Sequence, residues 1–364
     1  MVITRIREEV LSYPRLSNVR ERFGGVVVIG GANIDLGGRS EEELKRYTSN
    51  PGKINVGSGG VGRNIAHNLA LLSVPVTLLS AVGDDGEGIR ILEETGKAGV
   101  RTEQMIISGE HPTGIYLAIL DEKGEMEVAV SDMKILEEIT VEYLRSKAYL
   151  IKESKIVVAD TNIPEESIEY LVDLCNKVKV PLLIEPVSVE KAKKLRKILD
   201  GRGRGKGSGS GKWVIDYITP SEDELESILG AGTERDDDED IGVVRSAEEL
   251  KCRGVKNVIV TLGKRGIYVS YGGAGGSSEG GQDEPGKFMA PYKGDVVDVT
   301  GAGDALVAGL VYGIYKGYSV EVATRFGLGA AALTISTKEA VRRDLREGLL
   351  RSRIEEEKER GGLL

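Results

Sequence analysis

The feature that most constrains the fold is a regular alternation of short apolar runs with segments of helical periodicity. Residues 25–31, GVVVIGG, are β-branched and closed by two glycines, which is typical of a buried strand that ends in a tight turn. The alternation predicts helices over 64–72, 88–98, 141–146, 166–178, 189–199, 222–229, 247–253, 303–315 and 320–335, and strands over 156–159, 181–184, 214–218, 257–261 and 266–270. Strands separated by helices predict a doubly wound, mostly parallel α/β sheet with helices on both faces.

Two segments interrupt this alternation. Within residues 34–57, and again within 112–132, strand patterns follow one another without an intervening helix, which predicts a small β-sheet attached as a lid. We therefore expect an N-terminal extension over 1–23, one α/β domain over 24–345 that carries the lid, and a charged C-terminal tail over 346–364.

The charge and the scarce reactive side chains exclude several classes of function. The net charge of −9 gives no field that would attract DNA or RNA. No apolar run is long enough to span a bilayer, and the charged N-terminus does not resemble a signal peptide, so we expect a cytoplasmic protein without nucleic-acid or membrane partners. The only cysteines, Cys175 and Cys252, and the only histidines, His67 and His111, form no zinc-site spacing and no Ser-His-Asp triad.

Glycine is abundant, at 49 residues, but much of it belongs to low-complexity segments. Residues 201–212, 233–242 and 272–286 have the composition of surface loops. No glycine loop matches the phosphate-binding pattern G-x-x-x-x-G-K-[ST]. Residues 57–62, GSGGVG, do match the dinucleotide pattern, but Pro51 interrupts the strand that should precede them, so a dehydrogenase is a weak alternative.

The strongest chemical signal is DVTGAGD, residues 298–304. Small residues at a helix start allow a ligand to approach the backbone, and the unpaired amides attract anions. A carboxylate beside a phosphate is repulsive unless it has a task, and Asp304 could accept the proton of an attacking hydroxyl. The alternative is that Asp304 only caps the helix.

DVTGAGD, together with GSGGVGRNIAHNLALLSVPVTLLSAVGDD at residues 57–85, resembles the two signatures of the ribokinase-like, PfkB-type carbohydrate kinases. The resemblance runs from about residue 26 to 340 and implies transfer of the γ-phosphate of ATP to a primary hydroxyl of a sugar or nucleoside. It implies that Asp304 is the catalytic base, and that the amides of Gly301, Ala302 and Gly303 bind the transferred phosphoryl group. The implied sugar contacts are Asp35, Gly59, Gly60 and Asn64.

Within the family, segments such as GGANIDLGG, DTNIP and EPVSVEKAKK resemble the branch that phosphorylates the 5′-hydroxyl of pseudouridine. A nucleoside needs polar partners for its ribose and base edges, and Asn33, Asp35, Asn64, Asp160 and Asn162 offer them at predicted strand ends. Asp160 and Asn162 equally suit an ordinary turn after a strand. Adenosine, inosine, cytidine, ribose or fructose as substrate, and a nucleoside sensor without turnover, stay open.

The resemblance also implies an ATP site with Mg²⁺. The segment TLGKRG matches the family's nucleotide loop through Thr261, Gly263 and Gly266, although a tight hairpin would have the same pattern. Two further nucleotide contacts are implied. Thr300 adjoins the glycine turn at 301–303, and Gly329 lies on a helix of small residues that could flank the adenine. Ser221 and Glu224 stand where the family commonly has N-x-x-E, and Glu224 could hold water around Mg²⁺, although Ser221 is shorter than Asn. Asp298 is the candidate for a K⁺ site, which the sequence TKEA at 337–340 puts in doubt, and a homodimer through the lid is expected.

Overall fold

The fold is known from a computed structural model, which describes residues 24–203, 215–230, 239–271 and 286–361. Its central sheet has the strand order β14-β13-β12-β11-β10-β9-β1-β4. From β4 to β12 neighbouring strands are parallel, and β13 and β14 are antiparallel. The bounds are β1 Val26–Ile29, β4 Val76–Leu79, β9 Ile156–Asp160, β10 Leu182–Glu185, β11 Ile215–Ile218, β12 Val255–Thr261, β13 Ile267–Ser270 and β14 Lys287–Met289. The predicted doubly wound, mostly parallel sheet is therefore confirmed.

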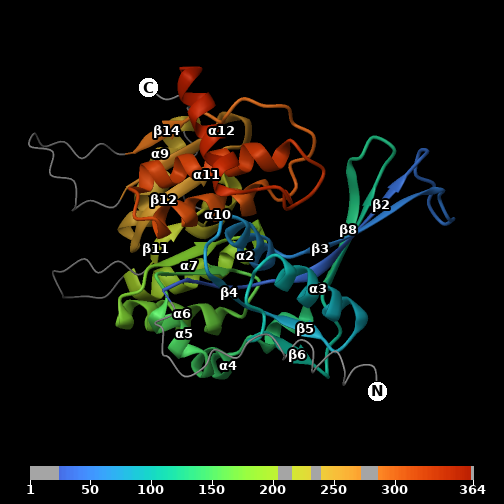
Figure 1. The fold of residues 1–364 in the computed structure, drawn as a ribbon, viewed down its shortest axis with the longest axis horizontal. Coiled ribbons are helices and arrows are strands. Elements are labelled where there is room, and N and C mark those ends of the chain that lie inside the picture. The colour runs from blue at the N-terminus through green and yellow to red at the C-terminus, as the bar shows by residue number, and fades with distance from the viewer. Residues whose placement is uncertain (1–23, 204–214, 231–238, 272–285, 362–364) are drawn as a thin grey trace, which may run out of the picture.

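Helices cover both faces of this sheet, because alternate strand residues point to opposite sides (Figure 1). Val27 and Ile29 pack with α4 Val141–Ser146, α5 Ala148–Glu153, α6 Glu165–Val178, α7 Val189–Gly203, α8 Glu222–Leu229 and α9 Glu239–Cys252. Val26 and Val28 pack with the opposite layer, which comprises α2 Val61–Leu71, α3 Gly86–Lys97, α10 Ala302–Tyr315, α11 Val320–Ile335 and α12 Glu347–Glu359. Two short 3₁₀ turns, η1 Lys134–Glu138 and η2 Gly263–Arg265, complete the described helical segments.

A separate four-stranded sheet projects from the body, where Figure 1 shows its hairpins reaching away from the helices. Its order is β3-β2-β7-β8, with bounds β2 Asn33–Ser40, β3 Gly52–Gly59, β7 Ile115–Leu120 and β8 Met126–Asp132. The predicted small sheet is thus present, and we call it the lid. A third sheet pairs β5 Ala81–Gly83 with β6 Ile106–Ser108 near its base.

The two faces of the lid differ in chemistry. Directly paired residues share a face, and one face carries Leu36, Ile54, Val56, Leu117, Ile119, Val128 and Val130. Several of these are open to solvent, with Ile54 76% and Val130 62% exposed. The opposite face carries Asp35, Tyr116 and Ser131. The lid therefore has an apolar face that is largely exposed, although Leu36 at its inner end packs against the core, and a polar face that carries a predicted substrate ligand.

Three boundaries differ from the expectation. The acidic stretch predicted as loop over 233–242 enters α9 at Glu239, because acidic side chains stabilise the positive end of a helix dipole. The predicted loop over 201–212 begins inside α7, which continues to Gly203. The predicted charged tail instead forms α12, whose Leu350 and Ile354 are buried in the core.

Other sequence expectations fall where the structure gives no description. The predicted extension over 1–23 and most of the glycine-rich loop predicted over 272–286 lie outside the described residues. In the described parts of the chain, no helix combines the length and apolar character that crossing a bilayer requires.

Candidate active site

The candidate site lies at the carboxyl ends of the parallel strands. The chain order reverses between β1 and β9, and clefts in α/β sheets form at such a switch point. Gly30 follows β1, and Asp160, Glu185 and Thr261 end β9, β10 and β12. One edge of the sheet therefore gathers side chains that are far apart in the sequence.

The turn before α10 supplies an anion-binding helix start. Gly301 caps this helix with a φ of 75°, and a Cβ there would lie 2.0 Å from the carbonyl oxygen of Ala340, so only glycine fits. A Cβ at Gly303 would meet nothing within 4 Å, which leaves the space beside it open. The amide of Ala302 donates to the Val299 carbonyl at 3.2 Å, and its predicted contact with the phosphoryl group stays a prediction. Within the described chain, the amides of Gly301 and Gly303 have no such backbone acceptor.

Asp304 stands in the first turn of α10 and lines a cavity of about 230 Å³. Its Oδ2 accepts a hydrogen bond from Asn64 Nδ2 of α2 at 2.8 Å. Burial raises the pKa of Asp304 to about 7, and the carboxylates of Asp160 and Asp35 contribute to this increase, against the hydrogen bond from Asn64. A carboxylate with such a pKa is suited to accept a proton near neutral pH.

The substrate-side residues predicted near the lid do gather at its root. Asn33 Nδ2 donates to Asp35 Oδ1 at 2.7 Å, and burial raises the pKa of Asp35. A Cβ at Gly59 would lie 2.0 Å from Asp35 Oδ2, and Gly60 has a φ of 98° against the backbone of Gly31. The two glycines therefore let β3 pass close to Asp35 and turn into α2.

Asp160 has a different role from the predicted substrate contact. It is 1% exposed, and its carboxylate accepts hydrogen bonds from the amides of Gly31 at 2.8 Å, Gly62 at 2.9 Å and Asn162 at 2.8 Å. Both oxygens are thus engaged by the backbone. Asp160 therefore supports the loops around the site, and its contact with a substrate stays a prediction.

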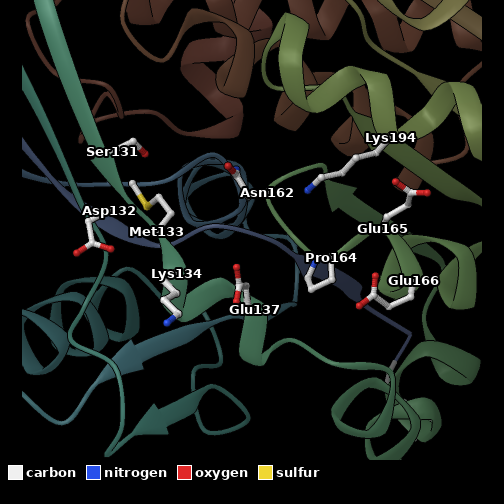
Figure 2. A pocket seen from close by; sticks show the side chains of 10 residues that line it. All are labelled: Ser131, Asp132, Met133, Lys134, Glu137, Asn162, Pro164, Glu165, Glu166 and Lys194. Carbon is white, nitrogen blue, oxygen red and sulfur yellow. The ribbon is translucent and has the colours of Figure 1, made fainter.

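Asn162 faces a larger cavity, of about 690 Å³ (Figure 2). Figure 2 shows Ser131 and Asp132 of the lid on one side of this cavity and Lys194 of α7 on the other. Lys191 donates to Asn162 Oδ1, and the Asn162 side chain is also hydrogen-bonded to the carboxylate of Asp160. Lys194 Nζ donates to the carbonyls of Thr161 and Ile163 at 2.8 Å each, which fixes the loop that carries Asn162.

Three of the predicted nucleotide residues line the cavity beside Asp304. Ser221 and Glu224 line it and form a capping box at the start of α8, in which Ser221 N donates to Glu224 Oε2 at 2.8 Å. Thr261 also lines it, and its amide donates to the Pro220 carbonyl at 2.8 Å. Gly263 has a φ of 57°, and a Cβ there would meet nothing within 4 Å, so its surroundings are open.

Two glycines predicted to contact the nucleotide are packing positions. A Cβ at Gly266 would lie 2.1 Å from the carbonyl of Met289 on the adjoining β14. A Cβ at Gly329 would lie 3.0 Å from Leu350 and 3.2 Å from Ile354 of α12. Both glycines therefore allow close packing of protein against protein, and their contact with the nucleotide stays a prediction. Asp298 accepts the amide of Thr300 at 2.8 Å, and the K⁺ site and the Thr300 contact stay predictions.

Glu185 is the site residue that the sequence analysis missed. It lines the same cavity as Asp304 and Glu224, and Thr219 donates to it. Burial raises the pKa of Glu185 well above its ordinary range, and the neighbouring Glu224 and Asp304 raise it further. Val187, two residues later, lines the cavity with a φ of 67°, a strained conformation for a β-branched residue. A polar residue at the end of a buried strand was the available signal, as it was for Asp160.

The carboxylates beside this cavity suit Mg²⁺ by their chemistry. Mg²⁺ prefers oxygen ligands and commonly takes one or two carboxylates together with phosphate and water. Glu185 and Glu224 face one cavity without a cationic side chain among its lining residues. Among the described residues no group of three metal-ligating side chains converges, so any Mg²⁺ would also need ligands from a bound phosphate or from water.

Comparisons with known proteins agree with this geometry. The family model described as pfkB family carbohydrate kinase matches residues 24–345. The chain is 37% identical to the pseudouridine kinase of Escherichia coli K12 over 85% of this chain and 90% of that protein. It is 28% identical to the guanosine-inosine kinase of Exiguobacterium acetylicum over 86% of this chain and 95% of that protein.

Solved structures show the same fold. A carbohydrate kinase from Agrobacterium tumefaciens superposes with a TM-score of 0.72 and 28% identity, covering 91% of this chain and 96% of that one. A ribokinase from Arabidopsis thaliana, complexed with ribose and ATP, superposes with a TM-score of 0.69 and 23% identity, covering 91% and 98%.

Proposed function

The chain belongs to the PfkB family of carbohydrate kinases, which transfer a phosphoryl group from ATP to a hydroxyl, and on this basis we propose that it converts pseudouridine to pseudouridine 5′-phosphate. The observation that carries the proposal is the place of Asp304. Its carboxylate accepts a hydrogen bond from Asn64, one of the predicted sugar contacts, and it also lines the cavity that Glu224 and Thr261 border. A base in that position can serve an acceptor on one side and ATP on the other.

In the proposed reaction Asp304 accepts the proton of the 5′-hydroxyl as its oxygen attacks the γ-phosphorus. The free amides of Gly301 and Gly303 and the positive end of α10 stabilise the negative charge on the transferred group. Asn33 and Asp35 hold the sugar hydroxyls from the lid, and the lid excludes water that would otherwise hydrolyse ATP.

Mg²⁺ would lie near Glu185 and Glu224, where it would neutralise charge on the ATP phosphates. Thr261, Gly263 and Ser221 would border the nucleotide. Burial beside other carboxylates raises the pKa of Glu185, and a bound cation would relieve that repulsion.

The larger cavity would receive the nucleobase. It adjoins the lid root, and its lining includes the Asn162 amide and polar side chains of the lid and α7 (Figure 2). The amino group of Asn162 carries two N–H donors; one serves Asp160, and the other suits a carbonyl oxygen of a base. Ribose or fructose would leave this cavity empty, so the site favours a nucleoside.

A phosphorylation panel tests the substrate. ATP consumption is measured with pseudouridine, uridine, adenosine, inosine, cytidine, ribose and fructose at equal concentration. We expect the highest kcat/KM with pseudouridine and at least about tenfold less with ribose, because the base contacts are lost. A higher kcat/KM with any other acceptor would overturn the substrate, and binding without ATP consumption would indicate a sensor.

We further propose that the apolar lid face pairs with the same face of a second copy. Five of the apolar side chains named above, Ile54, Val56, Leu117, Val128 and Val130, are exposed on one face, and a second copy offers the same surface by two-fold symmetry. Wild-type protein should therefore have twice the 39.1 kDa mass of the chain in light scattering.

Ile54→Asp tests this dimer. Ile54 lies on the apolar face, and its neighbour Asn55 is also exposed but points to the opposite face. We expect Ile54→Asp to weaken the dimer at least about tenfold, because one charge would be buried per copy, whereas Asn55→Asp adds the same charge and should leave it intact. A monomeric wild type, or equal effects of the two variants, would contradict the proposal.

A further inference from the structure

Arg63 of α2 is buried between the root of the lid and α3. Its side chain is 4% exposed, and Nη1 donates to the carbonyl of Ser58 at 2.8 Å. Nε donates to Thr95 Oγ1 at 3.0 Å, and Nη2 lies 3.8 Å from Glu94 Oε2. Ser58 Oγ also donates to Glu94 at 2.6 Å. These contacts hold the guanidinium in one position.

In this position Arg63 determines the orientation of the Asn64 side-chain amide. Nη1 of Arg63 lies 3.1 Å from Asn64 Oδ1. A guanidinium carries only donors, so the Asn64 atom that faces it must be the oxygen. The amino group of Asn64 then faces the opposite way, where it donates to Asp304 Oδ2 at 2.8 Å. Ser58, Arg63, Asn64 and Asp304 thus form one chain of hydrogen bonds from the lid to the candidate base.

We propose that Arg63 is a positioning residue of the phosphoryl transfer: held by the lid root and α3, it orients the Asn64 amide so that its amino group is donated to Asp304. This inference rests on the proposed function, in which Asp304 is the base. Nothing in the DVTGAGD motif supplies this donor. Arg63 would act only through Asn64 and would not touch the substrate.

The charges around Asp304 explain why the donor matters. The charged groups that face it are Asp160 at the end of β9, Asp35 on β2, Glu185 at the end of β10 and Glu224 on α8. All are carboxylates, and Asp160 and Asp35 disfavour the ionised form of Asp304, whereas the Asn64 amino group favours it. Without Arg63 the Asn64 amide can turn its oxygen toward Asp304, which would raise the pKa of the base further.

The groups around Arg63 itself are Glu94, Asp35, Arg90 and His67. Burial and the Arg63 charge lower the pKa of His67 to about 4, so His67 is neutral over the range in which Asp304 titrates. Arg90 donates to Glu94 at 3.0 Å but makes no contact with Asn64 among the described residues. Arg90 is therefore a matched control: an arginine on the same glutamate outside the chain of hydrogen bonds.

The test is the pH dependence of kcat/KM in Arg63→Met. We expect the acid limb to move up by about one pH unit and kcat at pH 7 to fall about fivefold, with KM for ATP nearly unchanged. Arg90→Gln should leave the limb in place. A limb that stays in place in Arg63→Met, or moves equally in Arg90→Gln, would overturn the proposal.

The double variant separates positioning from a general loss of structure. In an Asn64→Ala background, Arg63→Met should shift the limb no further, because both changes remove the same donor. An additional shift would mean that Arg63 acts by another route. If Arg63→Met does not fold, Arg63→Lys keeps the buried charge without the fork that reaches two acceptors, and should give an intermediate shift.

A measurement without turnover keeps this inference distinct from the proposed function. The difference in melting temperature between the protein and its Asp304→Asn variant should grow as the pH rises, and level off once Asp304 is ionised. In the Arg63→Met background that plateau should begin about one pH unit higher. If the wild type phosphorylates no acceptor, the proposed function fails, while an unmoved plateau refutes the role of Arg63.

Discussion

Replacing Asp304 by asparagine is expected to lower the turnover number by about two to four orders of magnitude, with little change in the affinity for ATP. The amide has the same shape and can still accept the hydrogen bond from Asn64, but it cannot take a proton from the attacking hydroxyl. Steady-state kinetics with the best acceptor of the panel provide the measurement. Asp295→Asn, an exposed carboxylate nearby, is the control, and a turnover number within about threefold of wild type in Asp304→Asn would contradict the assignment.

The same side chain sets a pH dependence with a defined sign. Because the pKa of Asp304 in the fold is about 7, kcat/KM should fall about tenfold per pH unit below that value as the base becomes protonated. A carboxyl whose folded pKa is raised destabilises the fold progressively as pH rises from the unfolded pKa to the folded one. Asp304→Asn should therefore melt at a higher temperature than wild type at pH 8, although it is nearly inactive.

Gly301→Ala and Gly303→Ala should separate the two tasks of the glycine turn. At Gly301 the positive φ and the carbonyl of Ala340 leave no room for a Cβ, so the substitution should cost about 1–3 kcal/mol of stability. It should also displace the start of α10 and reduce kcat/KM about a hundredfold, because small displacements of catalytic groups are costly. Thermal melting and kinetics on the same sample measure both effects.

Gly303 is the matched position two residues away. Its surroundings are open, so Gly303→Ala should keep or slightly raise the melting temperature, since alanine is the better helix residue. The added methyl group would occupy the space proposed for the phosphoryl group, and kcat/KM for ATP should fall about tenfold. Unchanged activity in Gly303→Ala would place the phosphate elsewhere.

The sequence predicted the sheet, its two helix layers and the lid because their periodicities are local properties. The helices at Val141–Ser146, Glu222–Leu229 and Val320–Ile335 have the predicted bounds. The start of α9 was wrong because the acidic residues that suggested a loop also favour the first turn of a helix.

The site was less predictable, because it depends on which strands become neighbours. Glu185 faces Asp304 only because β10 lies two strands from β1 in the sheet, an order that periodicity does not encode. The sequence could not show that Gly329 packs against α12, because a small residue on a helix accommodates a ligand or another helix equally well. Asp160 was interpreted as a substrate contact because a strand-end carboxylate gives no sign of whether backbone amides will occupy it.

The helix α12 shows that family similarity and the packed unit end at different places. The family match ends at residue 345, yet Leu350 and Ile354 of α12 pack against Gly329 on α11, which in turn packs on α10 (Figure 1). The helix α12, which has no catalytic motif, thus supports α10, the helix that carries Asp304, through α11. Substitutions in α12 can therefore change the position of Asp304 while every motif residue stays the same. Relatives with identical motifs need not have identical turnover numbers.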